Sequence, residues 1–159
     1  MVLQDIYLLA EIVAAFSVVA SLLFVGVQMR QNTQAMRIAA GQGLVAGWGA
    51  SNRDIISSPG MAEMLVPLLA GDSKLPTGAD GLRLRLWSQN IIREGEMNYY
   101  NWANGNLDDH HWEQVQANAV WFLSTPVGRE LWNELRLNHG LDFRGKLDAI
   151  AAELSQKEN

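Results

Sequence analysis

The sequence predicts an all-α protein in which an N-terminal transmembrane helix continues into a compact cytoplasmic bundle of about five or six helices. An apolar run near the start is long enough to cross a bilayer. In the rest of the chain, apolar residues recur at intervals of three and four, with little β-branched alternation. We expect the 4 prolines to lie at segment edges. We therefore divide the chain into a transmembrane anchor, residues 1–30, and a helical domain, residues 31–159.

The anchor is predicted from the run IVAAFSVVASLLFVGV, Ile12 to Val27, which contains no charged residue. About 20 mostly apolar residues suffice to span the hydrocarbon core of a membrane. A buried core helix and a cleaved signal peptide are the alternatives. The run is apolar around its whole circumference, which a small domain seldom covers. A signal peptide would need a basic segment before the run, and no Lys or Arg precedes it.

The charges that flank the run predict its orientation. Asp5 and Glu11 come before or at its start, whereas Arg30 and Arg37 follow it. Because basic residues favour the cytoplasmic side, we expect the N-terminus outside and the C-terminal domain in the cytoplasm, at a bacterial inner membrane.

Small residues within the run fall on one helix face, at spacings of four, three and four. They are Ala10, Ala14, Ser17 and Ser21. Such a face lets a second transmembrane helix, from another copy or from a partner subunit, approach closely. The alternative is that Ala and Ser are simply common in such helices.

The domain reads as successive helices with recognisable starts. A hydroxyl residue or a carboxylate before a helix can accept hydrogen bonds from its free N–H groups. Candidates for this capping role are Ser58, Asp108, Thr125 and Asp142. Residues 71–81 form the clearest loop. Glycines at 41, 43, 47 and 49 leave open whether the segment before Ser58 is straight helix, bend or loop.

The buried faces of these helices are predicted from their apolar spacing. The long helix after the loop carries Leu84, Trp87, Ile91, Gly95, Tyr99 and Trp102. The next three carry Trp112, Val115, Ala119 and Phe122; then Val127, Leu131 and Leu135; then Phe143, Leu147, Ile150 and Leu154.

The stretch LDDHHWEQ, residues 107–114, concentrates the residue types of a metal or acid–base site. Asp108 and His111 have the i, i+3 spacing of a carboxylate–histidine metal pair, and Glu94 and Glu96 could add ligands. Bundled di-metal sites need a second such pair, and the chain has none. We therefore interpret the stretch as a turn, a helix capped by Asp108 and a buried indole at Trp112.

Composition narrows the possible partners. The formal net charge of −5 disfavours nucleic acid, since phosphate binding needs clustered Lys and Arg. The absence of Cys excludes thiolate chemistry and Cys-based zinc sites. No motif indicates a cofactor. The aromatics Trp87, Tyr99, Tyr100, Trp102, Trp112, Trp121 and Trp132 either pack as core or line a pocket, and exposed ones such as Trp121 or Trp132 could contact a protein.

Four stretches of the chain resemble landmarks of a group of small bacterial membrane-anchored proteins. They are SLLFVGVQMRQNTQAMR, SSPGMAEML, MNYYNWANGNLDDHHWE and STPVGRELW. The shared pattern is a span ending in Q-x-R-x-N-T, then Y-Y…G-x-L-D with a following Trp, then [ST]-P-x-G-R. The glycine-rich stretch after Met36 departs from it. The resemblance covers nearly the whole chain and implies topology and fold, but it supplies no activity.

Three functions fit these features. The first is a non-enzymatic protein-interaction module, an accessory or scaffolding subunit of a larger membrane complex. The second is a membrane-tethered sensor or regulator that binds a small ligand among the aromatics of the long helix. The third is a metal-dependent enzyme that uses Asp108, His111 and Glu94 or Glu96.

Overall fold

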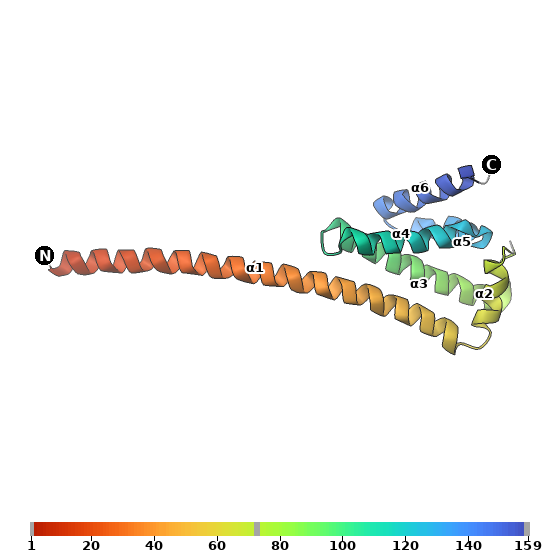
Figure 1. Cartoon of the computed structure of the whole chain (residues 1–159), viewed down its shortest axis with the longest axis horizontal. Coiled ribbons are helices and arrows are strands. Elements are labelled where there is room, and N and C mark those ends of the chain that lie inside the picture. The colour runs from red at the N-terminus through yellow and green to blue at the C-terminus, as the bar shows by residue number, and fades with distance from the viewer. Residues whose placement is uncertain (1, 72–73, 158–159) are drawn as a thin grey trace. The chain divides into compact units, whose positions relative to one another are not determined.

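The computed structural model describes residues 2–71 and 74–157, and all regular structure within them is helical. The predicted all-α fold is confirmed: a long apolar N-terminal helix is followed by a packed helical bundle (Figure 1). The helices are α1 (Val2–Ser57), α2 (Met61–Leu69), α3 (Gly78–Ala103), α4 (Asp109–Ser124), α5 (Pro126–Leu135) and α6 (Leu141–Lys157), with a 3₁₀ turn η1 (Arg136–Asn138) between α5 and α6. The predicted loop at residues 71–81 is shorter, since α3 begins at Gly78, and its residues 72–73 lie outside the described part.

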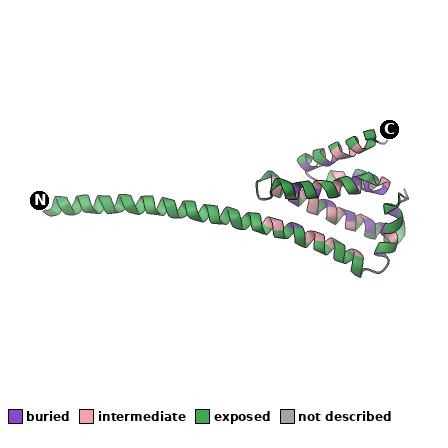
Figure 2. Cartoon of the chain, in the orientation of Figure 1, coloured by how far each residue is buried: buried purple, intermediate pink, exposed green. Residues whose placement is uncertain are grey.

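Helix α1 runs without a break through its four clustered glycines, which answers the question that the sequence left open there. The contacts divide the chain into two units, one ending at Ile38 and one comprising Ala39–Asn159. In the first unit every described residue is exposed (Figure 2). Its apolar stretch is long and apolar enough to cross a membrane, and none of that stretch is buried by protein.

In the second unit, the last part of α1 buries one face. Leu44, Gly47, Trp48, Ser51 and Ile55 are buried or half-buried, while most residues between them are exposed. Their spacing of three and four is that of one face of an α-helix. This face packs within the same unit, and Leu44 joins a cluster with residues of α4.

Two predicted caps are confirmed and explain where α4 and α5 begin. The Asp108 carboxylate accepts a hydrogen bond from the His111 backbone N–H at 2.9 Å. The Thr125 hydroxyl accepts one from the Gly128 N–H at 3.0 Å, and Pro126 follows at the first helical position, where its missing N–H costs nothing.

The other two predicted caps are wrong. Helix α2 begins at Met61 after Gly60, whose φ of 81° is left-handed, and no side chain caps it. Ser58 instead belongs to a turn in which its carbonyl accepts from the Met61 N–H at 3.1 Å. Asp142 lies inside the first turn of α6, because that helix already begins at Leu141. A carboxylate there still interacts favourably with the helix dipole.

The core of the second unit consists of three clusters of buried side chains. One joins α2 to α3 and α5: Met61, Leu65, Leu68, Leu84, Val127 and Leu131. A second joins α3, α4, α5 and α6: Ile92, Leu123, Trp132, Phe143 and Leu147. The third joins the end of α1 to α4: Leu44, Trp112 and Val115. The faces predicted for α4, α5 and α6 are confirmed, and that of α3 is shifted, since Ser88 and Ile92 are buried while Trp87 and Ile91 are only half-buried.

Hydrogen bonds to one carboxylate connect α3 to the residues just before α6. The Glu96 carboxylate lies 2.7 Å from His139 Nδ1 and accepts the Gly140 backbone N–H at 2.7 Å. The His139 side chain is fully buried. Trp132, for which we predicted exposure, is 2% exposed, because its indole N–H donates to Asp148 of α6 and its ring packs on Phe143.

Candidate functional site

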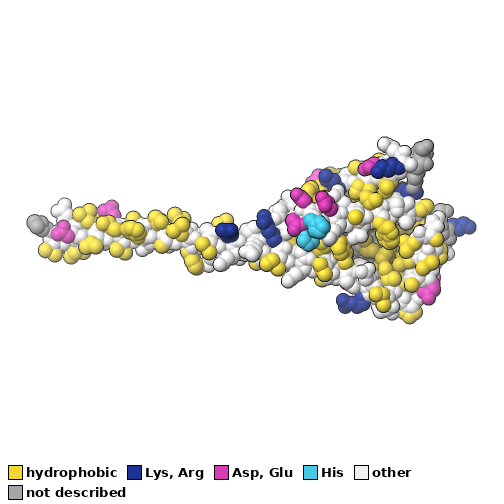
Figure 3. All heavy atoms as spheres, in the orientation of Figure 1, with side chains coloured by type: hydrophobic (Ala, Val, Ile, Leu, Met, Phe, Trp, Pro, Cys, Tyr) yellow, Lys and Arg dark blue, Asp and Glu magenta, His cyan; other side chains and the backbone are white. Residues whose placement is uncertain are grey.

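The most prominent feature of the second unit is a cavity of about 520 Å³. It is bounded by the last part of α1, by α3, α4 and α6, and apolar and aromatic side chains form most of its wall. Cavities of roughly 300–1,000 Å³ with mainly apolar walls and a few polar groups are the usual form of small-molecule sites. Figure 3 shows hydrophobic side chains gathered around a hollow on the visible face of the bundle.

Polar groups on the cavity wall lack protein partners. Asn98 is 3% exposed, and its Oδ1 has no hydrogen-bond partner. The buried indole Nε1 of Trp87 is also unpaired. Both residues line the cavity. A buried polar atom without a partner costs about 1–3 kcal/mol, so both residues lower the stability of this wall.

Glu94 is the only acidic residue among the described residues that line this cavity. It lies one helical turn before Asn98 on α3, and its Oε2 accepts a hydrogen bond from the Ser51 hydroxyl at 3.4 Å. A Cβ at Gly47 would lie 3.0 Å from the same oxygen, so the glycine makes room for the carboxylate. Burial, and to a smaller extent the negative charge of Asp54, raise the pKa of Glu94, although the hydrogen bond from Ser51 opposes them.

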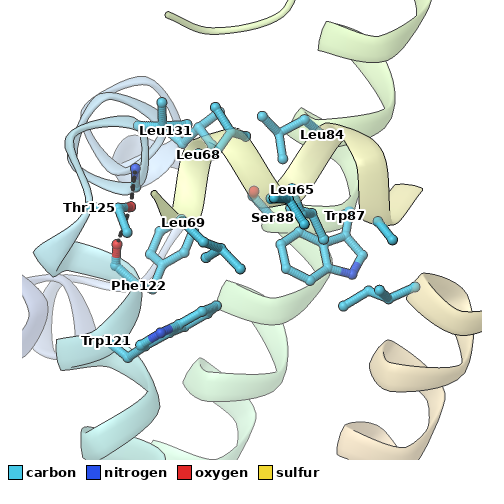
Figure 4. A pocket seen from close by; sticks show the side chains of 15 residues that line it. Leu65, Leu68, Leu69, Leu84, Trp87, Ser88, Trp121, Phe122, Thr125 and Leu131 are labelled. Carbon is cyan, nitrogen blue, oxygen red and sulfur yellow. Dashed lines mark hydrogen bonds between the residues drawn. The ribbon is translucent and has the colours of Figure 1, made fainter. Parts of the chain in front are cut away.

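A second, smaller cavity of about 180 Å³ lies between α2, α3, α4 and α5. Figure 4 shows Leu65, Leu68 and Leu84 around it, with Trp87 and Trp121 at its edge. The Ser88 hydroxyl is fully buried there without a partner. The two cavities share wall residues, namely Ile55, Trp87, Trp121 and Phe122. The two cavities therefore adjoin.

The residues considered as metal ligands are not brought together. Asp108 and His111 contact each other, with 2.6 Å between Oδ1 and Nδ1, beside the cap of α4. Glu96 pairs with His139, and Glu94 faces Ser51. Among the described residues, no three His, Cys, Asp or Glu side chains form a group that could hold a metal ion. The geometry thus gives the metal hypothesis no support.

The pairing of His111 with Asp108 changes the chemistry of that carboxylate. The hydrogen bonds from the His111 backbone and ring lower the pKa of Asp108. These hydrogen bonds favour the ionised form of Asp108, which accepts at the start of α4. Its role is structural, in agreement with the interpretation of LDDHHWEQ as a capped helix start.

The aromatic residues divide between core and cavity. Trp102 and Trp112 stack with ring centroids 5.2 Å apart, and Tyr99 contacts both. Trp87, Trp112 and Trp121 line the larger cavity, and they are joined by Trp48 of α1. Trp121 is 51% exposed, as predicted. Tyr100 is exposed as well, whereas Trp132 belongs to the core.

Sequence reasoning missed three polar residues that the fold buries: Ser88, Asn98 and His139. Ser88 and Asn98 stand beside apolar positions in α3, and a polar residue next to a stripe normally faces solvent. The available signal was that Ser88 falls between Leu84 and Ile92 at intervals of four. No local signal distinguishes His139 from an ordinary residue after a helix end.

Comparisons with family models, with curated proteins and with solved structures found no match to this chain.

Proposed function

We propose that this chain is a membrane-anchored binding protein whose helical unit holds a small, largely apolar molecule. The observation that carries the proposal is the cavity of about 520 Å³, whose wall includes the Glu94 carboxylate and two residues with unpaired buried polar atoms, Asn98 and Trp87. A domain selected only for stability would fill such a space, because cavities and unpaired buried polar atoms are both costly.

The anchor in this proposal is the apolar part of α1 in a lipid bilayer, at the inner membrane of a bacterium. Support comes from its length, its composition and the complete exposure of its side chains. Arg30 and Arg37 follow the apolar part and so favour a cytoplasmic binding unit, with the N-terminus outside. In this arrangement the protein acts as a sensor or regulator that responds to the bound molecule. The resemblance to small bacterial single-span proteins agrees with this topology and remains a prediction.

Native mass spectrometry of the full chain, released from its own membranes, tests this function. The wild type should carry a bound small molecule. Ala119→Phe places a ring at a half-buried wall position of the cavity and should remove that extra mass. Ala149→Phe on the exposed side of α6 is the matched control and should retain it. A wild type without any bound molecule, or equal occupancy in Ala119→Phe, contradicts the proposal.

A second candidate function is the accessory or scaffolding subunit of a membrane complex. It is favoured by the exposed Trp121 and by the unpaired small-residue face Ala10, Ala14, Ser17 and Ser21, which is exposed in the described chain. Two of these serines bond their hydroxyls to their own helix, Ser17 to Val13 O and Ser21 to Ser17 O, and so leave that face smooth for helix packing. Purification in mild detergent separates the two functions, since a stoichiometric protein partner supports the subunit.

A further inference from the structure

The larger cavity carries one carboxylate, Glu94, among polar wall groups that include both hydrogen-bond donors and acceptors. Asn98 offers an unpaired Oδ1, and Glu94 offers a carboxylate. In the described part of the chain, the 3.4 Å bond from Ser51 is the only hydrogen bond that this carboxylate accepts, and it forms no ion pair. Glu94 thus differs from Glu96, two residues away, whose oxygens both have close partners.

Glu94 and Asn98 lie on the same face of α3. Glu94 and Asn98 are four residues apart on α3, and side chains at that spacing are neighbours on one helix face, with Cβ atoms about 5–6 Å apart. An ionised carboxylate only accepts hydrogen bonds, so Glu94 suits a group with several donors, such as an ammonium.

The charges around Glu94 favour a cation as well. Asp54 of α1 adds negative charge. The positive charge of Arg93 helps to lower the pKa of Glu96. Lys146, the single basic residue among the described cavity-lining residues, has its Nζ 5.9 Å from the centre of the Trp102 ring. Beside Glu94 a cation would pair with the carboxylate, whereas an anion would be repelled by it.

Aromatic side chains on the cavity wall also favour a cation. Trp48, Trp87 and Trp112 all line the cavity. Indole faces attract cations, and desolvated pairs of this kind are among the stronger ones. The remaining wall is aliphatic and aromatic, so the rest of the ligand must be apolar.

We propose that the ligand class of this cavity is an apolar molecule carrying one protonated amine, whose ammonium pairs with the Glu94 carboxylate on the cavity wall. This inference rests on the proposed function. It also accounts for a carboxylate that is kept half-buried without a counter-charge: in the ligand-bound state the ammonium supplies one. The unpaired Trp87 Nε1 remains available to an acceptor atom elsewhere on the ligand.

The test is calorimetric titration of the full chain in phosphatidylcholine nanodiscs with three probes of the same carbon skeleton: phenylbutylamine, phenylbutanol and phenylbutyrate. Empty nanodiscs serve as blanks. A hydrogen bond to a charged group contributes enough for about 10-fold or more in affinity. We expect the amine to bind at least about 10-fold more tightly than the alcohol, and the carboxylate to bind most weakly.

Two variants locate the effect. Glu94→Gln keeps the shape and removes the charge, so the amine should fall to the affinity of the alcohol while alcohol binding is retained and reports that the cavity is intact. Glu63→Gln, at an exposed carboxylate of α2, should change neither. If the alcohol or the carboxylate binds as tightly as the amine, or if Glu94→Gln binds the amine like the wild type, the inference is overturned while the cavity remains a binding site. If none of the probes binds above the blank, the proposed function fails together with the inference.

Discussion

Glu96 of α3 pairs with His139, which lies just before α6; the His139 side chain is fully buried and that of Glu96 is half-buried. Burial alone, the largest single influence, would raise the pKa of Glu96, but the hydrogen bonds from Gly140 and His139, with the nearby charges of His139 and Arg93, lower it. A carboxyl group whose pKa is lower in the folded than in the unfolded state stabilises the fold above its ordinary pKa near 4.5. That stabilisation is lost as the pH falls from there through the lowered pKa.

Glu96→Gln should therefore lower the free energy of unfolding at neutral pH by about 1–3 kcal/mol, the cost of breaking hydrogen bonds to a charged group. It should also flatten the dependence of stability on pH below about 4.5. Chemical denaturation followed by circular dichroism at several pH values measures both effects. Glu113→Gln, at an exposed carboxylate of α4, is the control. An equal change in the free energy of unfolding of both variants would show that the Glu96–His139 pair does not stabilise the fold.

The caps give a second prediction for single side chains. Thr125→Ala and Asp108→Ala each remove an acceptor for a helix-terminal N–H and should destabilise the fold by about 1 kcal/mol. Ser58→Ala removes a hydroxyl that caps no helix, and its effect should be near zero. Thermal denaturation of the three variants compares them directly. A loss for Ser58→Ala as large as that for Thr125→Ala would contradict the start of α2 at Met61.

Some residues could be placed from sequence and others could not, for a physical reason. Asp108, Thr125 and Trp112 follow local rules of capping and periodicity, and the structure confirms them. Asn98 and His139 are buried by helices that lie far away in the sequence, so no local pattern marks them. The cavity depends on such residues and could be predicted only as a possible use of the aromatics.

At the level of the helices, the glycines of α1 have different roles although they look alike in sequence. Gly47 faces Glu94 so closely that a Cβ would lie 3.0 Å from the carboxylate oxygen, whereas Gly49 faces open space. Close packing of α1 on α3 therefore explains one glycine but not the other.

Gly49→Ala should stabilise the protein by about 1 kcal/mol, because Ala is the better helix former and meets no obstacle. Gly47→Ala gains the same propensity but must displace Glu94, so its net effect should be smaller or negative. Equilibrium denaturation of the two variants measures the difference. Equal stabilisation would show that α1 and α3 are farther apart at this point than the structure has them.

Sequence patterns predicted most of the buried helix faces but not every helix start. Apolar spacing predicted the buried faces of α4, α5 and α6. The start of α2 was missed because a turn through Gly60, with positive φ, intervenes between Ser58 and the helix. Glycine adopts this conformation readily, but the Ser-Pro pattern at residues 58–59 does not predict it.

For the whole molecule, we propose that the apolar part of α1 is a membrane anchor and that the binding unit lies in the cytoplasm. A reporter enzyme active only in the periplasm, fused after the last residue, should be inactive, and a cytoplasmic reporter at the same place should be active. The reason is the basic flank after the apolar part of α1, at Arg30 and Arg37. Periplasmic activity of the C-terminal fusion would reverse the topology.

We propose that a small molecule binds in the cavity whose wall includes Asn98 and Glu94. Hydrogen exchange of the full chain in nanodiscs, with and without phenylbutylamine, tests it most directly. We predict slower exchange in the cavity-lining segments, the end of α1 and the middle parts of α3, α4 and α6, and no change in the part of the chain before Ile38. Protection confined to that apolar part, or exchange that the amine does not alter anywhere, would contradict the account.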